Sequence, residues 1–211
     1  MNIETQDKSL LTNLFSTAVN SAKPEKILEE FLPKIAPSRP LIIAVGKAAA
    51  SMAKAVENKW GPCDGIALTR YGHSVACTGI EVMEAGHPFS DKNSRIGTRK
   101  ILSMVDNLKE EDCVYCLISG GGSSLLCKPR RGLAFAEKQR IFSILFSNSA
   151  PIREINTVRK HLSEIKGGQL SKIIFPAKVR SFIISDVPGD NPADIASGIT
   201  AAENTSGLDA L

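Results

Sequence analysis

Apolar residues in this chain follow two patterns that alternate along its length. Short apolar runs, of the kind that form buried strands of a parallel sheet, occupy residues 41–45, 65–69, 80–85, 113–118 and 178–187. Longer stretches that favour helices occupy residues 10–19, 26–31, 48–57, 91–108, 135–146 and 152–166. Strands that alternate with helices predict an α/β fold with a doubly wound, mostly parallel sheet and helices on both faces.

Three features of the predicted helices lead to predictions about packing and capping. The first helix is predicted to pack on something larger, because it has an apolar stripe made of Leu10, Leu11, Leu14, Phe15, Ala18 and Val19. The helix after residue 47 is predicted to lie close to the sheet, because one side carries Ala49, Met52, Ala53 and Val56. Ser90 or Asp91 is predicted to cap the helix that follows it.

The stretch Cys113–Leu126 organises the chain, because a predicted strand ends there in a turn of serines and glycines. Three consecutive glycines remove every Cβ where the backbone leaves the sheet, so N–H groups can approach a ligand closely. Phosphate is the usual ligand of such a turn. The predicted phosphate- and nucleotide-binding residues are Gly120, Gly121, Gly122, Ser123 and Ser124. The competing interpretation is a flexible connecting loop.

Two other predicted strands also end in charged residues. Lys47 follows the first strand and supplies a cation, while Asp186 and Asp190 follow the last strand and supply hard oxygen ligands. Together with a phosphate cradle, these groups are what phosphoryl transfer requires. We therefore predict Lys47 and Asp190 as catalytic residues, and Asp186 and Asp190 as Mg²⁺ ligands. The structural alternatives are a solvated lysine and aspartates that cap turns before Pro188 and Pro192.

Further polar residues are predicted to bind substrate. His87 comes just after a strand and can donate or accept a hydrogen bond. Asn156, Arg159 and Lys160 have the spacing that places residues on one face of a helix, and that predicted helix continues to Lys166. Such a face is either solvated or grips substrate carboxylate and phosphate. For His87 the alternative is an ordinary turn histidine.

Composition narrows the class of protein. The chain has 211 residues, of which 43% are hydrophobic and 23% charged, as expected for one globular domain. A scattered net charge of +4 does not indicate a nucleic acid partner, and no apolar run is long enough for a membrane partner. The N-terminus lacks a signal-peptide pattern, so we predict a cytoplasmic location. Five cysteines predict reduced thiols, with Cys113 and Cys116 on opposite faces of a strand.

Five motifs resemble those of the glycerate 2-kinases, a family often labelled hydroxypyruvate reductases. They are Val45–Ala49, Leu117–Leu126, Ile155–Ser163, Ile165–Gly168 and Ile184–Pro192. The resemblance implies that residues 1–211 form a Rossmann-like N-terminal domain, and that the reaction transfers the γ-phosphoryl of ATP to the 2-hydroxyl of D-glycerate with Mg²⁺. Carried over by motif, Lys47 is the catalytic lysine, the glycine turn holds phosphate and the loop Asp186–Asp190 faces the site.

Two departures from the family pattern shape the expected function. Ile199 stands where the family usually has proline, and no second domain with its expected catalytic arginine follows, so we expect a truncated chain that is inactive alone. Two alternatives stay open: an NAD(P)-dependent hydroxypyruvate reductase, although no Gly-x-Gly-x-x-Gly motif is present, and a non-catalytic module that binds phosphometabolites. D-Glycerate and ATP are the expected partners, and a homodimer stays open because the sequence does not fix the oligomeric state.

Overall fold

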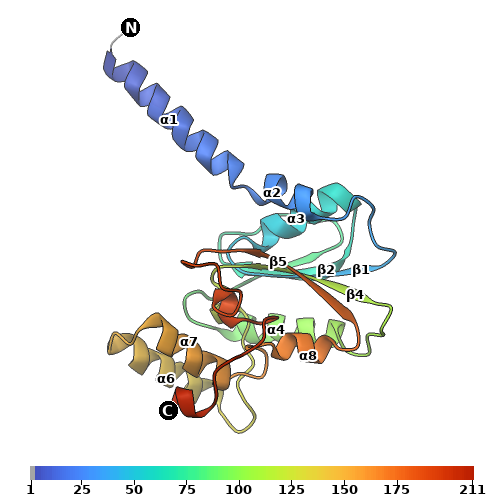
Figure 1. Cartoon of the computed structure of the whole chain (residues 1–211), viewed down its shortest axis with the longest axis vertical. Helices are drawn as coiled ribbons and strands as arrows, with labels where there is room; N and C mark the ends of the chain where they lie inside the picture. The colour runs from blue at the N-terminus through green and yellow to red at the C-terminus, as the bar shows by residue number, and fades with distance from the viewer. Residues whose placement is uncertain (1–2) are drawn as a thin grey trace.

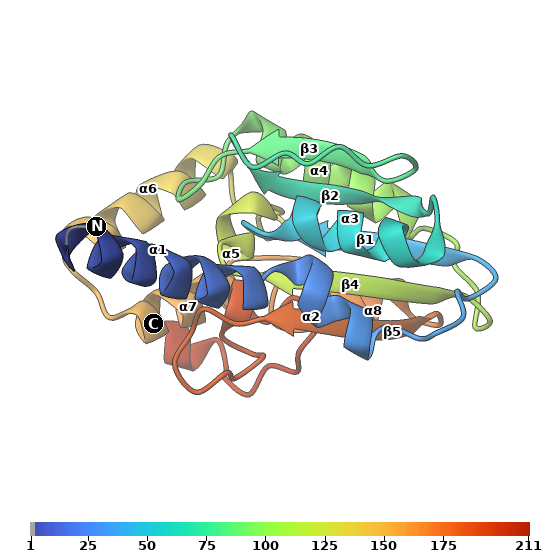
Figure 2. The ribbon, with the colours of Figure 1, turned by 90° about the horizontal axis from the view of Figure 1, so that it is seen from above.

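The computed structural model describes residues 3–211 and contains a five-stranded sheet whose paired strands all run parallel. The strand order is β3-β2-β1-β4-β5, and the strands are β1 (Pro40–Val45), β2 (Asp64–Arg70), β3 (Glu81–Ala85), β4 (Cys113–Ser119) and β5 (Lys178–Ile184). The chain adds β2 and β3 on one side of β1 and then β4 and β5 on its other side (Figure 2). The predicted doubly wound α/β fold is therefore confirmed, with a sheet that is parallel throughout.

Helices cover both faces of this sheet (Figure 1). One face is covered by α2 (Pro24–Phe31) and α3 (Ala49–Trp60), and the other by α4 (Lys92–Met104) and α8 (Gln169–Ile174). The other helical segments are α1 (Ile3–Ser21), α5 (Gly122–Leu125), α6 (Phe135–Ser147), α7 (Ile152–His161), η1 (Ile195–Ser197) and η2 (Leu208–Ala210).

Alternate residues of each strand supply two separate hydrophobic cores, because successive strand side chains point to opposite faces. In β1, Ile42 and Ala44 pack with α2 and α3, whereas Ile43 and Val45 pack with α4 and α8. The predicted small-residue side of α3 is fully buried, at Ala49, Met52, Ala53 and Val56. A helix with so little side-chain bulk can lie close on the sheet, as the sequence predicts.

Three elements end earlier than the sequence patterns predict: α4 at Met104 instead of residue 108, β5 at Ile184 instead of residue 187, and α7 at His161. Asp91 caps α4 and exchanges reciprocal hydrogen bonds with Ser94, so the predicted cap is confirmed. The helix predicted over residues 152–166 ends instead at His161. Beyond it the backbone pairs with the loop after α5, where Ser163 forms a bridge with Pro129, and this pairing ends the helix. The short helix α8, which the apolar pattern did not predict, then begins at residue 169.

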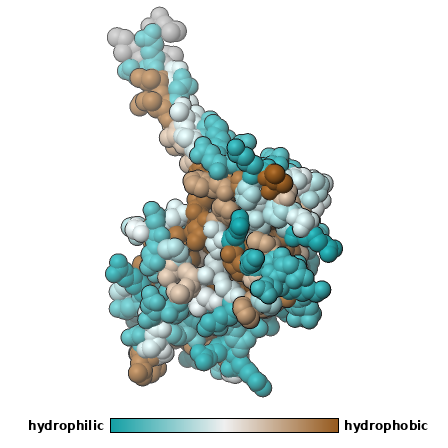
Figure 3. All heavy atoms as spheres, turned by 45° about the vertical axis from the view of Figure 1, so that its right-hand side comes forward, coloured by the Kyte–Doolittle hydropathy of each residue, from teal (hydrophilic) through white to brown (hydrophobic). Residues whose placement is uncertain are grey.

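The packing predicted for α1 is wrong within the described residues. α1 is helical as expected, but it projects away from the sheet and its covering helices (Figures 1 and 3). Its apolar stripe is exposed, with Phe15 70% accessible to solvent. Helical spacing predicts that an apolar face exists, but it does not predict what covers that face. Among residues 3–211, no helix has both the length and the hydrophobicity needed to cross a membrane.

The candidate site is positioned where the chain changes direction within the sheet. β1 and β4 are neighbours, but the chain continues from β1 to β2 on one side and from β4 to β5 on the other. The loops at the carboxyl ends of β1 and β4 therefore diverge and leave a crevice, which is where α/β sheets of this kind bind ligands. α5 lies at these strand ends, and α6 and α7 lie beyond the same edge (Figure 2).

Candidate functional site

The turn after β4 presents backbone donors at this edge of the sheet. Gly121 has a φ of 87°, a conformation that glycine adopts at little cost. The hydrogen bonds described for residues 3–211 leave the N–H groups of Gly121, Gly122 and Ser123 without a protein acceptor. Ser124 closes the turn by donating from both its N–H and its hydroxyl to the Gly121 carbonyl. The turn therefore has the donors that an anion such as phosphate requires.

The loop after β1 is tied to this turn. The Lys47 N–H donates to the Gly120 carbonyl at 2.8 Å, and the Ala48 N–H donates to the Ser119 hydroxyl at 3.0 Å. A Cβ added at Gly46 would collide with Ser119, so only glycine permits this approach. The two strand ends thus form one platform, which fixes where the Lys47 side chain starts.

Lys47 and Asp186 meet above the glycine turn. The Lys47 ammonium donates to the Asp186 carboxylate at 2.8 Å, although 139 residues separate them in the sequence. A Cβ added at Gly120 would fall on that carboxylate, so Asp186 lies directly against the turn. The side chains of Lys47 and Asp186 are 41% and 47% exposed, and an ion pair in such contact with water contributes little to stability. Stability therefore does not explain why these two charges are placed together.

His87 lies over the same turn. A Cβ added at Gly121 would come within 2.9 Å of the His87 ring. Burial lowers the pKa of His87, and the neighbouring cations Lys47 and Arg70 lower it further. The imidazole is therefore neutral near pH 7, and one ring nitrogen donates while the other accepts. The histidine predicted from its position after a strand is brought to the cleft by the structure.

Arg159 and Asn156 approach from α7 on the far side of the cleft. The Arg159 guanidinium donates to the Asn156 side-chain oxygen at 2.9 Å and stacks on the rings of Phe142 and Phe146, at 5.3 and 5.9 Å from their centroids. Burial lowers the pKa of Arg159 to about 10. The group stays charged at neutral pH, so the structure holds a cation with few protein partners next to the cleft.

These groups line one cleft of about 270 Å³. The structure brings together most of the residues predicted from the sequence, since the lining includes Lys47, His87, Gly121, Ser123, Ser124, Asn156, Arg159 and Asp186. Gly120 and Gly122, also predicted to bind phosphate, are buried beside the cleft and do not line it; an added Cβ would meet Asp186 and Ala196 respectively. Cations, free amides and a carboxylate in one cleft suit an anionic ligand such as a nucleotide phosphate.

Two residues predicted to bind substrate lie outside this cleft. Lys160 does not share the side of α7 that carries Arg159; it is buried and pairs with Glu203 at 3.0 Å. Lys166 is also buried and donates to the Leu126 carbonyl. Burial lowers the pKa of Lys166 well below its usual value. The assignment of both lysines to substrate is therefore corrected: they brace the segments around the site.

The ion pair of the buried Lys160 with the partly buried Glu203 leads to a prediction about stability. Burial acts to raise the pKa of Glu203, but hydrogen bonds from Thr205 and the charge of Lys160 lower it overall. Glu203→Gln leaves Lys160 buried without a counter-charge, so we expect the free energy of unfolding to fall by about 3 kcal/mol. The measurement is urea denaturation near neutral pH, with Glu110→Gln as the exposed control.

The same pair predicts a pH dependence with a definite sign. A carboxylate whose pKa is lowered by folding stabilises the protein above its unfolded pKa, here 4.5, and loses that contribution as the pH falls through its folded pKa. The difference in free energy of unfolding between the wild type and Glu203→Gln should therefore become smaller as the pH falls. A difference that stays constant down to low pH, or one no larger than that of Glu110→Gln, would contradict this account.

Asp190, predicted as catalytic and as a metal ligand, also lies outside the cleft. It is exposed, has a φ of 50° and lines a separate hollow with Ser185 and Pro192. The neighbouring Gly189 also has a positive φ, of 86°, so the loop turns at these two residues. In the part of the chain that the structure describes, no three His, Cys, Asp or Glu side chains cluster closely enough to hold a metal ion. Asp186 and Asp190 line different hollows of this chain, and their role as metal ligands stays a prediction.

A segment that sequence reasoning missed supports the cradle. Ala196 and Ser197 both have positive φ although neither is glycine, and the Ser197 hydroxyl lies 2.8 Å from that of Ser123. The N–H groups of Gly167 and Gly168 donate to carbonyls of this segment at 3.0 and 2.7 Å. Such strain persists only where the surroundings hold it, and it clusters at functional sites. The glycine pair was visible in the sequence, but its partner segment was not.

Fold and site together define a doubly wound α/β protein with its candidate site at the crevice between β1 and β4. Residues 10–211 match the family model described as Domain of unknown function (DUF4147), and the chain belongs to that family. Its relatives include glycerate 2-kinases, so the resemblance seen in the five motifs is confirmed.

Three comparisons give the extent of this similarity. The D-glycerate 2-kinase of Thermotoga maritima is 42% identical over 207 residues, which are 97% of this chain and 50% of that protein. A crystal structure of glycerate kinase from the same organism has a TM-score of 0.88 at 41% identity, covering 98% of this chain and 50% of that one. A protein of Agrobacterium vitis, provisionally named hydroxypyruvate reductase, is 45% identical over 96% of this chain and 47% of its own length. The chain thus spans about half the length of these relatives.

Proposed function

We propose that this chain is the nucleotide-binding domain of a D-glycerate 2-kinase that transfers the γ-phosphoryl of ATP to the 2-hydroxyl of D-glycerate. One observation carries the proposal: free amides of the glycine turn, the Lys47 ammonium and the Asp186 carboxylate meet at one point from three strand ends. Relatives named glycerate kinase support the same reaction. We also propose that the full-length protein contains a second domain.

In this reaction the 2-hydroxyl oxygen bonds to the γ-phosphorus while the bond between that phosphorus and the leaving oxygen of ADP breaks. The amides of the turn bind phosphate oxygens and orient them for in-line displacement. Lys47 stabilises the negative charge of the transferred group. The neutral His87 ring takes up the proton that the 2-hydroxyl loses as its oxygen bonds to phosphorus. Arg159, oriented by Asn156, binds the glycerate carboxylate.

Mg²⁺ is the cofactor that we propose with ATP, and Asp186 is the residue that would hold it. Its carboxylate lies against the backbone of the phosphate turn, where an added Cβ at Gly120 would displace it. A single carboxylate suits Mg²⁺, because this ion keeps several waters and takes other ligands from nucleotide phosphates. When bound, Mg²⁺ neutralises charge on the phosphate oxygens.

A hydroxypyruvate reductase is the alternative that the name of one relative raises. A dinucleotide site of that kind needs a Gly-x-Gly-x-x-Gly turn after the first strand, and the turn after β1 reads Gly46-Lys47-Ala48. That turn directs a lysine into the cleft, which favours phosphate over a nicotinamide cofactor. The other alternative is a non-catalytic module that binds phosphometabolites. It would have the same phosphate site in this chain and would lack only the second domain.

Product analysis tests the proposed function. The full-length protein, meaning this chain with the second domain proposed above, is incubated with D-glycerate and ATP, and in parallel with hydroxypyruvate and NADH or NADPH. We expect 2-phosphoglycerate, identified by phosphorus NMR against a 3-phosphoglycerate standard, and no oxidation of the reduced cofactors. Oxidation of NADH or NADPH with no phosphorylated product would establish the reductase instead.

The chain of 211 residues by itself is expected to bind nucleotide without turning over glycerate. Lys47 and Asp186 are about half exposed, so water screens the interactions that must strengthen in the transition state. The reaction needs a second wall that excludes water from the cleft. A coupled assay for 2-phosphoglycerate compares the chain with the Thermotoga relative at equal concentration. Comparable rates would overturn both this expectation and the proposed second domain.

A further inference from the structure

A buried lysine and a buried cysteine lie in contact beside the cleft, and the proposed phosphoryl transfer uses neither. The Lys138 ammonium, on α6, lies 3.4 Å from the Cys127 sulfur, in the loop after α5. The two residues are only 4% and 2% exposed. Among residues 3–211, the ammonium has no other hydrogen-bond acceptor and no carboxylate partner. Sulfur is a weak acceptor, and a buried ammonium usually needs a stronger one, so stability does not explain this contact.

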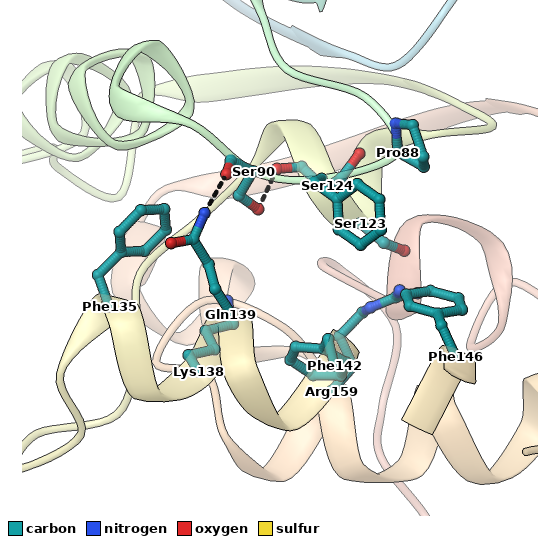
Figure 4. Close-up of a pocket in the computed structure, with 11 residues that line it drawn as sticks. Pro88, Ser90, Ser123, Ser124, Phe135, Lys138, Gln139, Phe142, Phe146 and Arg159 are labelled. Atoms are coloured by element: carbon teal, nitrogen blue, oxygen red, sulfur yellow. Dashed lines mark hydrogen bonds between the residues drawn. The ribbon is translucent and has the colours of Figure 1, made fainter. Parts of the chain in front are cut away.

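A small hollow gives access to Lys138 (Figure 4). It lies between α5, α6 and the loop after β3, and Lys138, Gln139 and Phe142 line it from α6. Its volume of about 30 Å³ has room for a water or two. Hydrogen peroxide is uncharged and little larger than water, so it can enter, whereas bulky thiols cannot. Cys127 does not line the hollow and lies behind Lys138, so a peroxide that reaches the sulfur arrives next to the amine.

We propose that Cys127 and Lys138 form a covalent cross-link, a sulfenamide, when the protein meets a peroxide. In the first step the sulfur bonds to one peroxide oxygen and the O–O bond breaks. The leaving hydroxide takes the thiol proton as water, and Cys127 becomes a sulfenic acid. Sulfur is thereby oxidised by two electrons, and the peroxide is reduced by two.

The second step joins the two side chains without a further oxidant. The Lys138 ammonium gives one proton to water, and its nitrogen lone pair then attacks the sulfur of the sulfenic acid. The S–O bond breaks, and the leaving hydroxide takes a second proton from nitrogen as water. Condensation with a nearby nitrogen is a known fate of sulfenic acids. The product is one S–N bond between Cys127 and Lys138, which a thiol can cleave again.

The cross-link would join two segments that flank the cleft. Cys127 follows α5, and Lys138 lies on α6 one helical turn before Phe142. The Phe142 ring supports the Arg159 guanidinium, at 5.3 Å from its centroid, and Arg159 lines the cleft. A bond in place of a 3.4 Å contact draws α6 toward the loop after α5. Oxidation at this pair therefore acts on the helix that supports a residue of the cleft.

Mass spectrometry of the 211-residue chain tests the cross-link. The folded chain is treated with hydrogen peroxide, unfolded in N-ethylmaleimide to block free thiols and digested with trypsin. Trypsin cuts after Arg130 and Arg131, between the two residues, so a link appears as two joined peptides. We expect the joined peptides to weigh two hydrogen atoms less than their sum, with fragment ions that place the bond at Cys127 and Lys138. Dithiothreitol added to the unfolded chain should remove the link.

The controls separate a built pair from chance oxidation. Lys138→Arg keeps a cation but removes the amine, so the link should be lost and Cys127 should carry added oxygen instead. The matched control is Lys128→Arg, because Lys128 is adjacent to Cys127 in sequence but pairs with Glu164 at 3.2 Å, and it should keep the link. The wild type treated with peroxide in urea should not form the link, since the contact depends on the fold.

The wild type alone can overturn the proposal, whether or not a variant folds. Cys127 that stays a free thiol, or that gains oxygen without a link, would contradict it. So would a bond from Cys127 to another lysine such as Lys166, a linked peptide that retains oxygen, or an equal yield from the chain in urea. None of these results depends on the proposed kinase reaction, because the experiment contains no nucleotide or glycerate.

Discussion

Lys47→Ala in the full-length protein is expected to lower kcat by about 100-fold or more, with a much smaller change in KM for glycerate. The ammonium starts from a platform in which the Lys47 N–H donates to Gly120, and its side chain reaches Asp186 directly above the glycine turn. A charge in that position interacts more strongly with the transferring phosphoryl than with the ground state. Steady-state kinetics with ATP and D-glycerate measures both parameters.

The matched control for Lys47 is Lys172→Ala, which removes an exposed lysine from α8 without touching the cleft. We expect its kcat and KM to match those of the wild type. Wild-type turnover in Lys47→Ala would contradict the catalytic role. A rise in KM at constant kcat would assign Lys47 to ground-state binding only.

Gly121→Val is expected to abolish binding of ATP and tripolyphosphate while most of the fold is kept. Gly121 has a φ of 87°, which a β-branched residue rarely adopts, and its added Cβ would come within 2.9 Å of His87. The valine side chain would also occupy the space in which the amides of the turn bind phosphate. Calorimetric titration measures the affinity, and thermal unfolding reports whether the fold survives.

Gly132→Val separates the two causes of this effect. Gly132 has a φ of 88°, almost the same as Gly121, but nothing lies within 4 Å of an added Cβ. The two variants therefore share the backbone strain and differ in what the new side chain blocks. We expect Gly132→Val to lose some stability and to keep its affinity. An affinity within about twofold of the wild type in Gly121→Val would make the turn a simple connector.

The fold was predictable because the strands of a parallel sheet are buried on both faces, so each strand appears in the sequence as a continuous apolar run. The runs of β1 and β4 each end in residues unlike those before them, Gly46-Lys47 and Ser119–Ser124, and the structure places both ends at one crevice. The end of α7 was not predictable. It depends on pairing of Ser163 with Pro129, a contact between segments that no local pattern records.

A site residue was predictable where its position depends only on the strand that it follows. Lys47 and Asp186 follow strands, and they meet. Lys160 was misassigned because the acidic partner that buries it, Glu203, lies 43 residues further along the chain. Asp190 lines a different hollow from Asp186, in a loop that turns at Gly189, and its catalytic role stays a prediction.

An amide NMR titration of the 211-residue chain with ATP tests the central claim most directly, because it reports the glycine turn residue by residue. The account predicts that the largest saturable shifts occur at Gly120–Ser124 and Lys47, with further shifts at Asn156 and Arg159. Tripolyphosphate should reproduce the shifts of the turn. Unchanged turn amides at saturating ATP, with shifts gathered instead around a remote cavity such as that of Arg130 and Arg131, would contradict it.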